Sequence, residues 1–193
     1  CMRRIVAAPT AGACGVLPAI LVPYYDSLLK NENKEQDVAE AEEKIIKALY
    51  VAAGIGGVIA KRASISGAKG GCQAEIGSAS AMSAGALTYL QGGNETQIIN
   101  SASMALKNLL GLVCDPVAGL VEVPCIKRNV GGAVNAVSCS QMALAGIESR
   151  VPADEVIDAM AYVGDKMDET LRETGIGGLA GTPFGKKVAD EIL

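Results

Sequence analysis

Three of the six cysteines lie in settings that suit a metal ligand. Cys72 follows two glycines and Cys125 follows a proline, and both stand where a helix is predicted to begin. Cys114 stands where a helix is predicted to break, just before Asp115 and a proline. Free N–H groups and the dipole at a helix start favour the thiolate, which is the form that binds metal. The three cysteines lie far apart without CxxC spacing, so spacing alone leaves ordinary core thiols as the simpler interpretation.

The other three cysteines give weaker signals. Cys139 lies in a run of small and apolar residues and is predicted to pack inside a helix. Cys14, beside a glycine, either packs in the core or lines a pocket, and Cys1 is too close to the chain end to interpret. A disulfide framework suits small secreted chains, whereas a chain of 193 residues can bury a core of its own. We therefore expect reduced thiols, as in the cytoplasm.

The composition indicates helices with small residues at their contacts. Half of the chain is hydrophobic, yet only 3% is aromatic and 23 residues are Gly. This mixture favours closely packed helices over a sheet. The expected fold class is all-α, a single compact domain over residues 1–193 with about six or more packed helices and Gly-rich loops. A net charge of −4 without any basic block argues against a nucleic-acid surface.

Apolar periodicity places the elements along the chain. The predicted helices cover residues 16–29, 37 to at least 59, 72–90, 94–113, 124–147 and 152–171, with irregular segments at 31–36, 64–71 and 175–185. Asn94 and Gln97 resemble a capping box. Of two apolar stretches, residues 5–25 are broken by Pro and Gly, and residues 48–60 are too short for the ~20 residues of a membrane span. We therefore expect a soluble protein.

Four groups of residues carry a resemblance to a known family. In chain order they are AAPTAG at 7–12, SISG at 64–67 with GCQAE at 71–75, LVCDPVAG at 112–119 and VPCIKRN at 123–129. These segments resemble the motifs of iron–sulfur-dependent L-serine dehydratases, in the catalytic part that forms the α chain of two-chain members. The resemblance spans almost all of this chain, in the family's order, and motifs of this length rarely coincide by chance.

The resemblance implies a role for three of the cysteines. Cys72, Cys114 and Cys125 fall at the family's ligand positions, which implies that they hold a [4Fe-4S] cluster. Three thiolates leave one iron without a protein ligand, and that iron would act as a Lewis acid on the hydroxyl and carboxylate of L-serine. A base would take the α-proton while hydroxide leaves the β-carbon, and the resulting aminoacrylate would become an imine that water converts to pyruvate and ammonia.

Four further residues are candidates for substrate binding. Thr10 and Gly12 lie in a Pro-Thr-Ala-Gly loop whose hydroxyl and backbone N–H groups could hold a carboxylate, with a plain turn as the alternative. Arg128 and Asn129 lie about one helical turn beyond the third ligand cysteine and could reach the cluster or the substrate. For Arg128, an ion pair at the surface is the alternative.

The family carries parts that this sequence lacks. They are a further N-terminal stretch of the catalytic part and a regulatory β chain or domain. Since the chain contains no His, the unknown catalytic base is expected in those missing parts, and the fragment is expected to be inactive alone. Glu75 lies one helical turn from Cys72, with a buried polar partner for a neighbouring helix start as the plain alternative. The expected partners are L-serine, the missing parts and a second copy in a dimer, with no nucleic acid and no membrane.

Two other classes of function remain open at this point. In the first, Cys72, Cys114, Cys125 and a carboxylate form the closed tetrahedral site of a structural zinc or other metal-binding module. In the second, the chain is a metal-free helical partner subunit whose cysteines are core residues.

Overall fold

Helices form the regular structure of residues 6–29 and 35–192, the part of the chain described by a computed structural model. The α-helices are α1 Val16–Leu29, α2 Glu35–Arg62, α3 Gly67–Gly70, α4 Ser78–Leu90, α5 Glu95–Lys107, α6 Cys125–Leu144, α7 Ala153–Lys166 and α8 Pro183–Ile192. A π-helical turn, η1 (Gln73–Gly77), precedes α4, and two 3₁₀ turns are η2 (Val117–Gly119) and η3 (Glu169–Leu171). Within the described ranges no strand forms, and one isolated bridge joins Cys114 to Arg172. The expected all-α class is confirmed.

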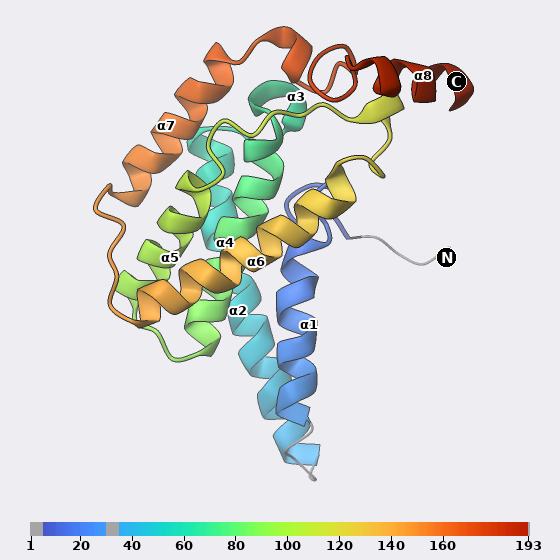
Figure 1. Ribbon diagram of the computed structural model, residues 1–193. Helices are drawn as coiled ribbons and strands as arrows, with labels where there is room; N and C mark the ends of the chain where they lie inside the picture. Colours follow the sequence, from blue (N-terminus) through green and yellow to red (C-terminus); the bar gives the residue numbers. More distant parts are fainter. Residues whose placement is uncertain (1–5, 30–34, 193) are drawn as a thin grey trace.

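Helix α4 is the centre of the fold. Its residues from Ser78 to Thr88 are all buried, and it packs against α1, α2, α5 and α6 (Figure 1). The helix can be buried on every side because its side chains are small, mostly Ala and Ser. Of its three serine hydroxyls, Ser80 Oγ donates to the Gly132 carbonyl at 2.8 Å across the contact with α6, whereas those of Ser78 and Ser83 have no hydrogen-bond partner among the described residues.

The backbones of α6 and its neighbours approach closely at Gly132. An ideal Cβ on Gly132 would lie 2.8 Å from Ile76 Cγ2 and 3.3 Å from Val16 Cγ2. The adjacent Gly131 faces outward, and a Cβ there would meet nothing within 4 Å. Glycine at 132 is therefore required by packing, whereas glycine at 131 is not.

The helix predicted over residues 94–113 is wrong at its end, because α5 stops at Lys107. Residues 108–111 form turns, and Gly111 adopts a left-handed backbone with φ of 84° that ends the helical path. Leu109 keeps its place near the core without being helical, since it packs against the cluster that contains Cys72 and Cys114. An apolar period of helical spacing thus continues past the real end of the helix.

Other predicted boundaries differ less. α1 has the predicted bounds, and α2 begins at Glu35, while most of the predicted linker at 31–36 lies outside the described residues. The predicted helix 72–90 is divided into η1 and α4, and α7 ends at Lys166 instead of 171. The predicted irregular segments contain short helices, α3 and the start of α8.

Two local expectations are settled directly. The Asn94 side chain accepts from Gln97 N and the Gln97 side chain accepts from Asn94 N, each at 3.0 Å, so the predicted capping box is confirmed. Within the described ranges, no helix combines the length and the apolar character needed to cross a membrane.

The neighbouring glycines of α6 provide a matched test of this packing. Gly131→Ala should raise the free energy of unfolding by ~0.5–1 kcal/mol, because Ala favours a helix and the added methyl meets no neighbour. Gly132→Ala should lower it by ~1–3 kcal/mol, because the methyl overlaps Ile76. Urea denaturation of both variants measures the difference, and equal effects at the two positions would contradict the packing described.

Candidate functional site

Three separate segments bring Cys72, Cys114 and Cys125 into one region. Cys72 immediately precedes η1, Cys114 lies in the extended segment after α5, and Cys125 is the first residue of α6. All three are buried, with 2%, 3% and 7% of their surfaces exposed. Each thiol lies close enough to the others to affect their ionisation. Residues far apart in sequence are thus gathered at one buried place.

Burial makes these thiols weaker acids than free cysteine. It raises the pKa of Cys72 to about 11, while the nearby Arg128 guanidinium offsets part of that rise. Burial also raises the pKa of Cys114, helped by the Glu75 carboxylate, and raises the pKa of Cys125. The expectation that a helix start lowers the pKa is therefore wrong for Cys72 and Cys125, because desolvation of the thiolate outweighs the helix-start effect.

Glu75 lies beside Cys114, in the π turn. One carboxylate oxygen accepts a hydrogen bond from Thr10 Oγ1 at 2.7 Å, and the other lies 3.9 Å from Cys114 Sγ, which donates to it. Burial raises the pKa of Glu75, and the hydrogen bonds from Thr10 and Cys114 act against that rise. Sequence reasoning placed Glu75 one helical turn from Cys72 and left a packing role as the plain alternative. The signal that could have identified it is its place in the motif GCQAE.

Two glycines are needed beside this carboxylate. An ideal Cβ on Gly12 would lie 3.1 Å from Glu75 Oε1. On Gly67 it would lie 2.8 Å from Glu75 Oε2 and 2.9 Å from Cys114 Sγ. The PTAG and SISG motifs thus each supply a glycine where the backbone passes closely over the Glu75 carboxylate.

Arg128 and Asn129 make contacts on opposite sides of the start of α6. Arg128 Nη1 donates to the Val113 carbonyl and to Asp115 Oδ1, each at 2.8 Å, so its ion pair is with a buried residue and not at the surface. Asn129 Nδ2 donates to the Gly12 carbonyl at 2.7 Å, and its oxygen accepts from Gly15 N at 3.0 Å. Asn129 therefore fixes the loop that carries Thr10 and Gly12.

A groove of about 330 Å³ reaches one side of this site. It is largely apolar, and its lining includes Gly12, Cys14, Cys125 and Asn129. Cys14 therefore lines a groove, the second of the two interpretations given to it. Cys139 is fully buried in a different apolar cluster and has no contact with the three gathered thiols, in agreement with a packing role.

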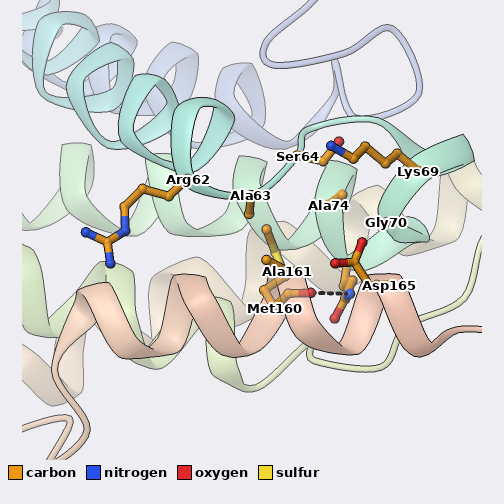
Figure 2. A pocket seen from close by; sticks show the side chains of 11 residues that line it. Arg62, Ala63, Ser64, Lys69, Gly70, Ala74, Met160, Ala161 and Asp165 are labelled. Carbon is orange, nitrogen blue, oxygen red and sulfur yellow. Dashed lines mark hydrogen bonds between the residues drawn. The ribbon is translucent and has the colours of Figure 1, made fainter.

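A second pocket lies between the end of α2, α3, the start of η1 and α7 (Figure 2). Arg62, Lys69 and Asp165 give it a polar lining, and none of the cysteines faces it. The bond drawn in Figure 2 runs from Gln73 Nε2 to the Met160 carbonyl of α7, at 3.0 Å. This bond anchors the first residue of the π turn. Sequence reasoning missed Gln73 altogether.

Three thiols are a donor set that either an iron–sulfur centre or a zinc site can use. Three buried thiols are the soft ligands that iron–sulfur clusters use. In a cluster each thiolate binds a different iron, whereas a zinc site needs its ligands around one ion. In the described part of the chain, no three His, Cys, Asp or Glu side chains are gathered tightly enough to hold one ion. The donor set alone therefore does not distinguish a cluster from a single metal ion.

Comparison with known proteins agrees with the motifs. The family model for the serine dehydratase alpha chain matches residues 1–180. A "Probable L-serine dehydratase, alpha chain" from Bacillus subtilis is 52% identical over 192 residues, covering 100% of this chain and 61% of that protein. A protein of the same description from Latilactobacillus sakei is 53% identical, covering 100% and 87%. "L-serine dehydratase TdcG" from Escherichia coli is 46% identical over 179 residues, covering 92% and 37%.

The chain thus spans 61% of the Bacillus relative and a smaller share of the Escherichia coli one. The match nevertheless runs through all four motifs and includes the three gathered cysteines. The chain belongs to the serine dehydratase alpha chain family.

Proposed function

We propose that this chain is the cluster-holding part of an L-serine dehydratase, which converts L-serine to pyruvate and ammonia. The observation that carries the proposal is the convergence of three buried thiols beside Glu75 and Arg128. Family membership supports the substrate, because the relatives are described as L-serine dehydratases.

In this proposal Cys72, Cys114 and Cys125 would hold a [4Fe-4S] cluster through their thiolates. The bound cluster would supply an open iron as a Lewis acid for the serine hydroxyl and carboxylate. The protein contributes a buried site, in which electrostatic interactions are stronger than in water. Glu75 keeps the Thr10 hydroxyl fixed by a hydrogen bond of 2.7 Å, and Asn129 fixes the backbone at Gly12.

Thr10 and Gly12 are proposed to contact the carboxylate of the substrate from the loop that Asn129 holds. The Gly12 backbone lies within reach of Glu75 and beside the groove that leads to Cys125. Serine is small and zwitterionic, so only a short polar loop is needed to orient it. No residue of this chain is proposed as the base for the α-proton.

The remaining parts of the enzyme are also proposals. The name "alpha chain" carried by the relatives supports a companion β chain or domain. We propose further that an N-terminal segment contributes the base, that the enzyme is a dimer and that the fragment alone is inactive. The five described cysteines are free thiols, which supports the reducing cytoplasm as its location.

The first test replaces the cysteines one at a time in the complete enzyme. Cys72→Ser, Cys114→Ser and Cys125→Ser should each remove most of the iron and lower serine deamination by at least ~100-fold, because an alcohol is a poor iron ligand. Cys139→Ser is the matched control and should keep its iron. Iron per chain and pyruvate formation are measured after purification without oxygen. Iron lost from the Cys139 variant but kept by the Cys114 variant would show that other thiols are the ligands.

The second test exchanges the metal. Chelation of iron from the complete enzyme should abolish pyruvate formation, and anaerobic incubation with Fe²⁺ and sulfide should restore it. Zn²⁺ alone should not, because one ion cannot be shared by ligands placed for separate irons. Full activity with Zn²⁺ and no sulfide would instead support a single-ion site.

A further inference from the structure

The segment that carries Cys114, residues 111–115, belongs to no helix. We call it the Cys114 segment. Its backbone is held from outside: the Leu112 carbonyl accepts from Gln73 N at 2.9 Å, and Cys114 N donates to the Leu171 carbonyl at 2.8 Å. A segment without its own hydrogen-bond ladder keeps its place only through such contacts. The position of the Cys114 thiol therefore depends on neighbouring elements.

Gln73, the residue after Cys72, holds the beginning of the Cys114 segment. Its side chain is fully buried, and its oxygen accepts from Gly111 N at 2.9 Å. Its nitrogen donates to the Met160 carbonyl of α7, the bond drawn in Figure 2. Both ends of the carboxamide are thus used, and the Cys72 and Cys114 segments are fixed to one another and to α7.

Arg128, one helical turn after Cys125, holds the other end of the segment. Its guanidinium donates to Val113 O and Asp115 Oδ1, the residues on either side of Cys114. Asp115 is 3% exposed, and its second oxygen accepts from Leu179 N at 2.7 Å. The start of α6, the Cys114 segment and the chain after η3 are therefore joined through one buried ion pair.

We propose that Gln73 and Arg128 are positioning residues that pre-assemble the three thiols before any metal binds. Each residue lies within one helical turn of one cysteine in sequence and holds the segment of another. The inference rests on the proposed function for the role of the thiols as ligands. It reassigns Arg128, since a guanidinium that holds Val113 and Asp115 serves the ligands and not the substrate. Residues that orient ligands in this way commonly change metal affinity by ~10–100-fold when they are replaced.

The test uses the full-length protein stripped of metal, with N-ethylmaleimide as the probe and peptide mass spectrometry as the readout. In Gln73→Leu and in Arg128→Met, Cys114 should be labelled at least ~10-fold faster than in the unaltered protein, because the segment opens more often when a buried hydrogen bond is lost. Cys139 should keep its slow rate, since it lies in another cluster. Arg128→Lys should restore part of the protection, because an ammonium can make one of the two bonds.

Matched controls separate positioning from general loss of stability. Gln97→Leu removes a glutamine that donates to the Ala143 and Leu144 carbonyls, and Arg62→Met removes an arginine paired with Asp154 and Asp158. In both variants Cys114 should be labelled as slowly as in the unaltered protein.

The Arg128 variant could also change the acidity of the thiol. Loss of the Arg128 charge favours the neutral thiol, which reacts more slowly, so faster labelling reports exposure and not acidity. Arg128→Met combined with Asp115→Asn removes both charges of this ion pair, in case the single variant does not fold.

Two results would overturn the proposal. The first is that Cys114 is labelled no faster in the Gln73 and Arg128 variants than in the unaltered protein. The second is that Cys139 is labelled as fast as Cys114, either in these variants or already in the stripped unaltered protein. Iron content after anaerobic incubation with Fe²⁺ and sulfide is measured on the same samples. Protection of Cys114 without iron uptake by the unaltered protein would refute the proposed function alone. Iron uptake and serine deamination without the labelling difference would refute the pre-assembly alone.

Discussion

The hydrogen bonds that hold the Cys114 segment determine how the rest of the site is built. A buried stretch of irregular backbone is stable only when its polar groups find partners outside the stretch. Here the partners come from η1, from α6 and from the chain after α7, which are the elements that also carry or flank the other candidate residues. Providing hydrogen-bond partners for the backbone of the Cys114 segment therefore brings the three cysteines together, although no two of them share a helix.

Bringing the thiols into the core also changes their chemistry. Desolvation raises the pKa of all three, and Arg128 is a cation that offsets this for Cys72 and Cys125. Thiolates in such surroundings need more positive charge than one guanidinium provides, because an unpaired buried charge is costly. A metal centre would supply that charge, and its binding would release protons from the thiols. The burial that makes them poor nucleophiles is thus compatible with a role as ligands.

The helices were predictable, whereas their local interruptions were not. Apolar periodicity located α2, α5 and α7, a run of small residues located α4, and the capping box at Asn94 marked the start of α5. Periodicity failed at the end of α5, because Leu109 is buried by tertiary packing in a non-helical turn. The π turn at η1 has no sequence signature of this kind, although π turns are frequent at functional sites. Because Glu75 lies in this π turn, the α-helical spacing assumed from the sequence does not describe where its side chain points.

The candidate site was predicted in part for a related reason. The cysteines were recognised through their motifs, but the contacts of Gln73 and Asp115 join segments that lie far apart in sequence. Local patterns carry no information about such pairings. For Arg128, helical spacing indicated correctly that it lies near Cys125, yet it could not indicate the buried acceptor at Asp115. Only the three-dimensional arrangement distinguishes a substrate contact from a bond that holds a ligand segment.

This arrangement gives a physical reason for the length of the cysteine motifs. Each motif contains a cysteine and, within about one turn, a side chain that anchors its segment to another: Gln73 after Cys72, Asp115 after Cys114, and Arg128 after Cys125. An anchor so close in sequence moves as one body with its cysteine, so fixing the anchor fixes the thiol. A distant anchor would leave the intervening backbone free to shift. Placing the anchor and the thiol in one short motif therefore fixes thiols on separate segments with few hydrogen bonds.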